Sequence, residues 1–169
     1  MTERSIRLNG AEVTLTTDDP LSQLLYALRE QAGQHGPKFG CGVSQCGACT
    51  VLVNDVPTRS CVSTVAALPT APPAQVRTLD GLDPGHPLPQ AFLDEQAAQC
   101  AFCINGMVMG SLAWLESRVA AGEKKVPTRS EVATHLSGDN AQTFTYLCRC
   151  GAHNRIIDAI RAAAKEMAR

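Results

Sequence analysis

The feature that most constrains this chain is the grouping of its eight cysteines. Three lie close together, a fourth follows soon after, and two close pairs come later in the chain. The full set is Cys41, Cys46, Cys49, Cys61, Cys100, Cys103, Cys148 and Cys150. Cysteines that only fill a core as small apolar residues would show no such grouping. We therefore expect two metal-binding groups of four cysteines each.

The first group has the spacing Cys-x4-Cys-x2-Cys, with Cys61 after eleven further residues. This is the plant-type ferredoxin spacing for a [2Fe–2S] cluster, and soft thiolates suit iron–sulfide chemistry. Gly40, Gly42 and Gly47 have no Cβ atom, so they allow backbone N–H groups to approach the cluster sulfurs. Zinc is the alternative, but four-cysteine zinc sites usually combine two Cys-x2-Cys pairs, so the spacing favours iron–sulfur.

The second group combines Cys100-x2-Cys103 with Cys148-x-Cys150. Each pair directly precedes a predicted helix, so two helix N-termini would point at one site. Their partial positive charge stabilises thiolates and a net-negative cluster. By spacing alone, this group fits zinc nearly as well as an iron–sulfur cluster.

The first half of the chain has patterns typical of strands around one helix. Strands are predicted as a hairpin over 5–15, a second pair over 49–65 that turns at Asn54-Asp55, and a short strand over 76–79. A helix is predicted over 18–33, with Asp19 as its N-cap and Gly33 at its end.

The second half has helical periodicity. Helices are predicted over 90–99, 105–122, 130–137 and 154–169. Trp114, the only tryptophan, is expected to pack in this helical part. Composition alone would place the linker between the two halves in the proline-rich stretch 68–75.

Charge and hydropathy exclude several classes of partner. The 169 residues include 15 Lys+Arg and 16 Asp+Glu, which gives a net charge of −1. The chain therefore has no excess positive charge with which to bind nucleic acid or an anionic membrane. No apolar run of about 18 residues and no secretory signal are evident, so no membrane insertion is expected. The expected location is the cytoplasm, with export to the periplasm alongside a signal-bearing partner as the alternative.

The cysteine motifs, taken together, resemble those of a known family. FGCGVSQCGACTV, the later Cys61, QCAFCINGMVM and LCRCGAHNRIIDAI are similar to the small iron–sulfur subunit of the molybdenum hydroxylases, such as xanthine dehydrogenase and aldehyde oxidoreductase. The resemblance implies an α+β fold with a β-grasp, plant-type ferredoxin-like domain at 1–79, a linker at 80–89 and a four-helix bundle domain at 90–169. The stretch 68–75 then becomes an internal loop.

The resemblance also implies two [2Fe–2S] clusters and their ligands. The ligands of the first would be Cys41, Cys46, Cys49 and Cys61, and those of the second Cys100, Cys103, Cys148 and Cys150. Gln99 matches a glutamine that hydrogen-bonds the pterin in relatives. Cys150 matches the ligand cysteine that lies against the pterin amino group.

In this family the small subunit transfers electrons and has no catalytic residue of its own. The resemblance implies a large partner subunit whose molybdopterin, as a cytosine dinucleotide, hydroxylates an N-heterocycle or oxidises an aldehyde. Electrons would pass through the helical-domain cluster and then the ferredoxin-domain cluster to FAD or to the haem of a cytochrome c domain on a partner.

Two rival functions stay open from the sequence. They are a stand-alone two-cluster electron carrier and a non-redox zinc interaction module. Transient carriers commonly display a charged patch of one sign, whereas the charge here is mixed, which favours a permanent partner.

The sequence departs from the family pattern in a few places. Forty-four residues separate Cys103 from Cys148, more than the family usually has, and GDNAQTFTY is predicted to be part of the excess. CINGM and CGAHNR are similar to the nicotinate- and isoquinoline-type hydroxylases, which favours an N-heterocycle as substrate. His153 could lie near the second cluster, although a surface or helix-capping position is preferred. The other histidines, His35, His86 and His135, are expected at the surface.

Overall fold

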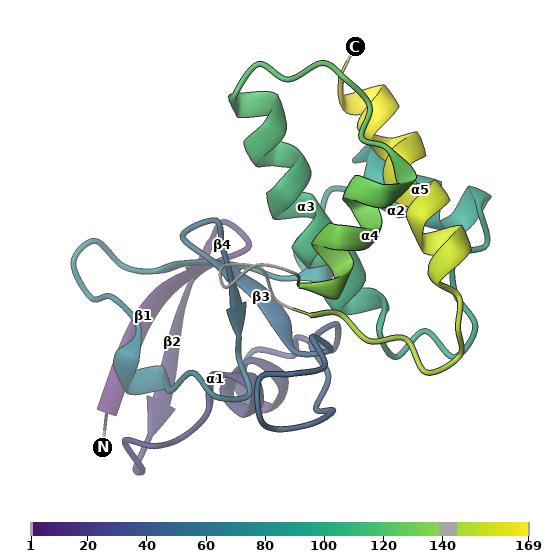
Figure 1. The fold of residues 1–169 in the computed structure, drawn as a ribbon. Coiled ribbons are helices and arrows are strands. Elements are labelled where there is room, and N and C mark those ends of the chain that lie inside the picture. Colours follow the sequence, from purple (N-terminus) through teal and green to yellow (C-terminus); the bar gives the residue numbers. More distant parts are fainter. Residues whose placement is uncertain (1, 139–144, 169) are drawn as a thin grey trace.

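The computed structural model describes residues 2–138 and 145–168 of the chain. Its two halves differ in architecture: the first is a sheet with short helical segments, and the second is built of longer helices (Figure 1). Most of the predicted excess segment GDNAQTFTY, namely 139–144, lies outside the described residues. The α+β fold class is confirmed.

The first half is a five-stranded mixed sheet with the strand order β2-β1-β5-β3-β4. The strands are β1 (Thr2–Leu8), β2 (Ala11–Thr17), β3 (Thr50–Val53), β4 (Val56–Arg59) and β5 (Gln75–Arg77). The predicted hairpins are confirmed: Asn9 and Gly10 join β1 to β2, and Asn54 and Asp55 join β3 to β4, all with positive φ. Strand β5 lies between the hairpins, parallel to β1 and antiparallel to β3.

The helix predicted over 18–33 is much shorter in the structure. It consists of α1 (Leu24–Tyr26) and a π-helical continuation, η1 (Ala27–Gln31). The predicted N-cap was wrong: the Asp19 carboxylate accepts from the Leu21 N–H at 2.8 Å, in a turn before the helix. Pro20 and Leu21 form a turn, and Gln23 is extended because it forms a β-bridge with Thr64. Pairing with a distant segment therefore delays the start of this helix.

The second half contains the four predicted helices. They are α2 (Pro87–Asp94), α3 (Ile104–Ala120), α4 (Arg129–Ser137) and α5 (His153–Met167). Helix α2 begins earlier than predicted because the His86 ring accepts from the Leu88 N–H at 3.1 Å and Pro87 occupies the first turn. It also ends earlier than predicted, and Gln96, just beyond it, has a φ of 47°. Gln99 therefore lies in a loop.

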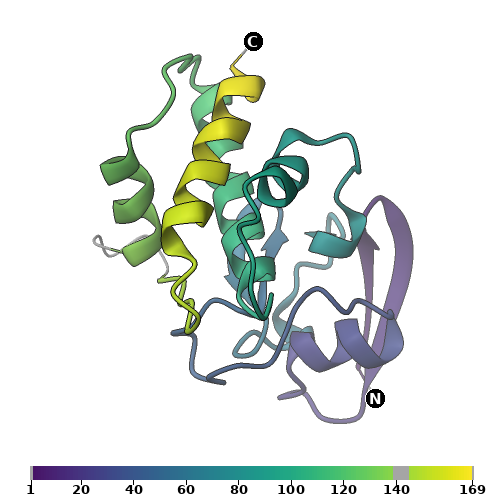
Figure 2. The same cartoon turned by 90° about the vertical axis from the view of Figure 1, so that its right-hand side faces the viewer.

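Each half has its own hydrophobic core. The core of the sheet half includes Ile6, Leu15, Leu28 and Val76. The core of the helical half is larger and includes residues from all four helices, with α5 packed against α2 and α4 (Figure 2). Leu52 of β3 belongs to this second core, so the two halves pack against each other.

One histidine prediction was wrong. His135 is only 9% exposed, and its ring stacks on Trp114 with the ring centroids 4.6 Å apart. It also lies beside the Tyr146 ring. The surface position was predicted because the sequence offers no ligand partner for it, but Trp114 and the segment that carries Tyr146 cover it. Trp114 packs against the helical core, as predicted.

None of the helices in the described part of the chain has both the length and the apolar character needed to cross a bilayer.

Candidate metal centres

The first cysteine group begins in an irregular loop before β3. Three backbone N–H groups point at the Cys41 sulfur: those of Val43, Gln45 and Cys46, at 3.4, 3.2 and 3.3 Å. Partial burial opposes ionisation, but these N–H groups outweigh it and lower the pKa of the Cys41 thiol to about 7. The loop therefore already favours a thiolate at this position.

The last two cysteines of this group are buried at the open end of the β3–β4 hairpin. Cys49 is 2% exposed and Cys61 is 1% exposed, and both contact Leu25 of α1. Burial, with the neighbouring Cys61, raises the pKa of the Cys49 thiol to about 11. The Ser60 hydroxyl donates to the Cys49 carbonyl at 2.7 Å and ties the two segments together. A positive ion here would be needed to hold these thiols as thiolates.

The glycines of the loop are needed for its close turns. A Cβ atom on Gly40 would lie 2.6 Å from the Cys46 sulfur. Gly47 has a φ of 84°, and a Cβ atom there would lie 2.7 Å from the Tyr146 ring. The absence of side chains thus allows the loop to fold around sulfur on one side and against the helical half on the other.

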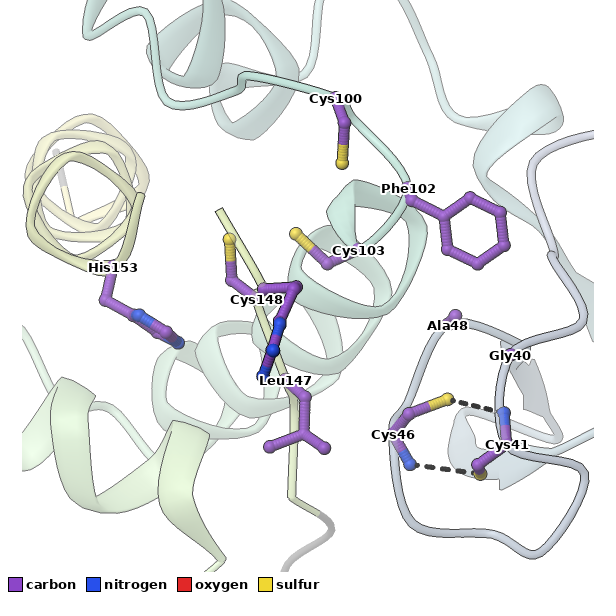
Figure 3. Close-up of a pocket in the computed structure, with 11 residues that line it drawn as sticks. Gly40, Cys41, Cys46, Ala48, Cys100, Phe102, Cys103, Leu147, Cys148 and His153 are labelled. Atoms are coloured by element: carbon purple, nitrogen blue, oxygen red, sulfur yellow. Dashed lines mark hydrogen bonds between the residues drawn. The ribbon is translucent and has the colours of Figure 1, made fainter. Parts of the chain in front are cut away.

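The second cysteine group lies where two helices begin. Cys103 is the N-cap residue of α3, and Cys148 and Cys150 directly precede α5. Cys103 interacts with Cys148, and burial raises the pKa of the Cys103 thiol to about 12. Cys100 is exposed, and the Phe102 N–H, together with the Cys150 side chain, lowers the pKa of its thiol. Cys100, Cys103 and Cys148 point toward one another (Figure 3).

Both groups border one cavity. Its volume is about 390 Å³, and its lining includes Cys41 and Cys46 on one side and Cys100, Cys103 and Cys148 on the other. Phe102, Leu147 and His153 lie around it (Figure 3). The two candidate centres therefore face each other across a short gap.

The cysteine side chains interact in pairs. These pairs are Cys41 with Cys46, Cys49 with Cys61, Cys100 with Cys150, and Cys103 with Cys148. A zinc site needs its four ligands around one ion, whereas a [2Fe–2S] cluster divides four thiolates between two irons. The paired arrangement and the sulfur donors fit the cluster better than zinc.

Two other residues from the sequence analysis lie beside the second group. Gln99 is exposed and adjoins Cys100 in the loop after α2. His153 is exposed and is the first residue of α5, and it lines the shared cavity. It makes no side-chain cap of that helix.

Comparison with known proteins supports the same interpretation. Residues 6–69 match the model of a 2Fe-2S iron-sulfur cluster binding domain, and 78–161 match that of a [2Fe-2S] binding domain. A nicotinate dehydrogenase subunit from Pseudomonas putida is 41% identical over 166 residues, which span 95% of this chain and 94% of the relative. The alpha subunit of isoquinoline 1-oxidoreductase from Brevundimonas diminuta is 39% identical over 163 residues, which span 95% and 97%.

The chain belongs to the small iron–sulfur subunits of the molybdenum hydroxylases.

Solved structures share the fold of this molybdenum hydroxylase small subunit. Quinoline 2-oxidoreductase of Pseudomonas putida 86 has a TM-score of 0.82 at 33% identity, with 99% of this chain and 95% of that chain covered. Aldehyde oxidoreductase of Desulfovibrio gigas has a TM-score of 0.83 at 30% identity, and the match covers 97% of this chain but 17% of that chain. The family predicted from the motifs is confirmed, and with it two [2Fe–2S]-binding domains and a role in electron transfer within an oxidoreductase.

Sequence reasoning missed the residues that join the halves of this small subunit. Arg59, Asn105 and Tyr146 are all buried and contact the segments that carry the cysteines. Arg59 is the one with a signal that could have been read, because it is a charged residue two positions before Cys61 in a segment of strand character.

Proposed function

We propose that this chain is the electron-transfer subunit of a heteromeric molybdenum hydroxylase and that its eight cysteines hold two [2Fe–2S] clusters. The ligands of the first cluster are Cys41, Cys46, Cys49 and Cys61. The ligands of the second are Cys100, Cys103, Cys148 and Cys150. Each cluster, when bound, supplies a one-electron carrier, and the chain contributes no acid, base or nucleophile to the reaction.

One observation carries this proposal: the two cysteine groups lie on opposite sides of a junction, and a backbone hydrogen bond next to Cys148 crosses it. The backbone N–H of Leu147 donates to the carbonyl oxygen of Cys46 at 3.0 Å. Leu147 directly precedes Cys148, so a ligand of one group is linked to a ligand of the other through backbone and one hydrogen bond. Two one-electron centres in series need such proximity.

The direction of transfer follows from exposure. Cys100 and Gln99 are exposed at the surface, whereas Cys49 and Cys61 are buried. We assign the exposed face to the large subunit, with Gln99 and Cys150 contacting its molybdopterin, here a cytosine dinucleotide. Electrons then pass from the second cluster to the first and leave to FAD or to a cytochrome c domain on a further partner.

The names of the relatives support a proposal for the substrate class. Two that span almost the whole chain are named for nicotinate and isoquinoline, and one solved neighbour for quinoline. We propose an N-heterocycle as the substrate of the complex, with an aldehyde as the alternative. We also keep the boundaries 1–79, 80–89 and 90–169 for the ferredoxin-like domain, the linker and the helical domain, and the cytoplasm as the location.

Co-purification tests this proposal. The chain is expressed with its genomic neighbours, tagged and purified anaerobically, and the preparation is analysed for molybdenum, iron, acid-labile sulfide and bound flavin or haem. We expect a large molybdenum-containing chain and two distinct [2Fe–2S] signals in the EPR spectrum of the reduced complex. A fully loaded chain that carries both signals but never retains a molybdenum-containing partner would support the stand-alone carrier instead. Zinc in place of iron would exclude both.

A further inference from the structure

The two halves of the molecule meet at the segments that carry the cysteines. Asn105, in the first turn of α3, is 2% exposed, and its amide donates to the carbonyl oxygens of Ala48 and Thr50 at 2.9 and 2.8 Å. Next to it, a Cβ atom on Gly106 would lie 2.2 Å from the carbonyl oxygen of Gly47. The helical half is thus seated directly on the loop that leads from Cys46 to β3.

Arg59 holds the other side of this junction. It ends β4, is 2% exposed, and its guanidinium donates to the Thr50 hydroxyl in its own half. Its second terminal nitrogen donates to the carbonyl oxygen of Thr145 at 2.7 Å, in the segment that leads to Cys148. The guanidinium carbon lies 4.6 Å from the centroid of the Tyr146 ring. One planar group therefore contacts both halves.

The partners of Arg59 adjoin candidate ligands of both groups. Thr50 follows Cys49, Arg59 itself lies two residues before Cys61, and Tyr146 lies two residues before Cys148. Displacement of the Thr145–Leu147 segment would also lengthen the Leu147–Cys46 hydrogen bond. The contacts of Arg59 therefore influence the distance between the two cysteine groups.

We propose that Arg59 is a positioning residue that fixes the Cys148–Cys150 segment against the Cys46–Cys49 loop and so sets the coupling between the two clusters. The inference rests on the proposed ligand assignment. The rigid fork of arginine suits this role, because a lysine ammonium on a flexible stem cannot reach two acceptors in fixed directions and stack on a ring at once.

A second arginine at the same interface provides a matched control. Arg77 of β5 pairs with Glu116 of α3 through two contacts of 2.8 and 2.9 Å, and with Asp55 at 2.8 Å. It joins the halves as Arg59 does, but its partners lie farther from the cysteines along the chain. Asp55 is six residues from both Cys49 and Cys61, and Glu116 is thirteen residues after Cys103. Removing it should weaken the interface without moving one cysteine group relative to the other.

The test compares Arg59→Lys, Arg59→Gln and Arg77→Gln in the purified complex. With both clusters reduced, neighbouring spins interact, and the EPR spectrum shows this as splitting or broadening at low temperature. We expect Arg59→Gln to retain its iron but to lose this splitting, Arg59→Lys to lose part of it, and Arg77→Gln to keep it unchanged. The potentials of the single clusters, measured in parallel, separate a change of distance from a change of local charge.

Two results would overturn the proposal. One is an unchanged splitting in both Arg59 variants at full iron content. The other is loss of iron from both variants, because a residue that only positions the two groups is not required for cluster retention. Failure of the ligand assignment would look different: the unmodified complex itself would then lack two cluster signals.

Discussion

The backbone N–H of Leu147 and the carbonyl oxygen of Cys46 are 3.0 Å apart and form a hydrogen bond. This contact joins a loop of the ferredoxin-like half to the segment that enters the last helix, although about a hundred residues separate them in the sequence. The cysteine groups of the two halves are held together by packing, and their arrangement depends on the fold of the whole chain.

Removing one ligand from each group should affect the clusters separately. We expect Cys61→Ala to abolish the signals of the first cluster and Cys103→Ala those of the second, each with loss of about half the iron. EPR spectra and iron analysis of the reduced variants check this. Val62→Ala, next to Cys61 but 48% exposed, serves as the control and should retain all iron. Loss of both signals in either cysteine variant would contradict the separate assignment.

Methyl groups added at the interface between the halves should destabilise the protein. A Cβ atom on Gly110 would lie 2.2 Å from the Tyr146 ring, with backbone and ring both packed. We expect Gly110→Ala to lower the free energy of unfolding by about 1–3 kcal/mol, although alanine normally stabilises a helix interior by about 1 kcal/mol. Chemical denaturation measures the change. Ser117→Ala, at an exposed position of the same helix, is the control and should change the free energy of unfolding by less than about 0.5 kcal/mol. An increase in the stability of Gly110→Ala would refute the packing argument.

Acid should weaken the helical half through His135. Burial lowers the pKa of His135 from 6.5 to about 4, and the Gly110 backbone offsets this only in part. The unfolded chain binds a proton below pH 6.5 that the folded chain takes up only near pH 4. The free energy of unfolding therefore falls as the pH drops across this window, by up to about 3 kcal/mol.

His135→Phe keeps the ring stack with Trp114 and removes the titration. Its stability should depend less on pH between 6.5 and 4 than that of the unmodified protein. Cluster loss in acid affects both proteins, so the difference between their denaturation profiles is the informative quantity. Parallel profiles would exclude a role for this histidine.

The ion pairs of Glu116 should add modestly to the free energy of unfolding, and salt should reduce their contribution. Its carboxylate makes two contacts with Arg77, and both side chains are about one-third exposed. Glu116→Gln is expected to cost about 1 kcal/mol at low salt, and less in 1 M salt. Glu123→Gln removes a single contact between Arg118 and the half-exposed Glu123, and it should lower the free energy of unfolding by only a few tenths of a kcal/mol. Equal effects of the two substitutions would argue against the bidentate geometry.

Gln99 offers a test of the partner surface. Because its side chain is exposed, Gln99→Ala should leave the melting temperature and the iron content unchanged. It should nevertheless reduce the molybdopterin retained by the purified complex, which fluorescence of the oxidised pterin measures. Gln90→Ala, also exposed but on α2, is the control and should retain the pterin. Equal pterin content in both variants would remove Gln99 from the proposed contacts.

The sequence predicted local features well where local residues determine them. Asn9-Gly10 and Asn54-Asp55 form their turns because these residue types tolerate positive φ. The cysteine spacings identified two sites because metal ligation requires particular residues at particular separations. The helices of the second half were found because their apolar stripes are long.

Features that depend on distant segments were missed. The first helix begins late because Gln23 pairs with Thr64, a partner that no local pattern reveals. His135 is buried by Tyr146, which follows in a different segment. Arg59 and Asn105 act across the interface, so their roles follow only once both halves are placed.

The unequal burial of the cysteines also bears on how such a protein is made. Cys49 and Cys61 are buried at the open end of the β3–β4 hairpin, while Cys100 remains at the surface. Cys41 and Cys46 border the shared cavity, but Cys49 and Cys61 become buried when the β3–β4 hairpin folds. A biosynthetic iron–sulfur donor therefore has free access to all four cysteines of the first site only before that hairpin closes. We infer that maturation has an order, with the first cluster installed as the sheet forms. When iron and sulfide are added to the folded apoprotein, the second site should then fill faster than the first. When the apoprotein is refolded in their presence, the two sites should fill at equal rates.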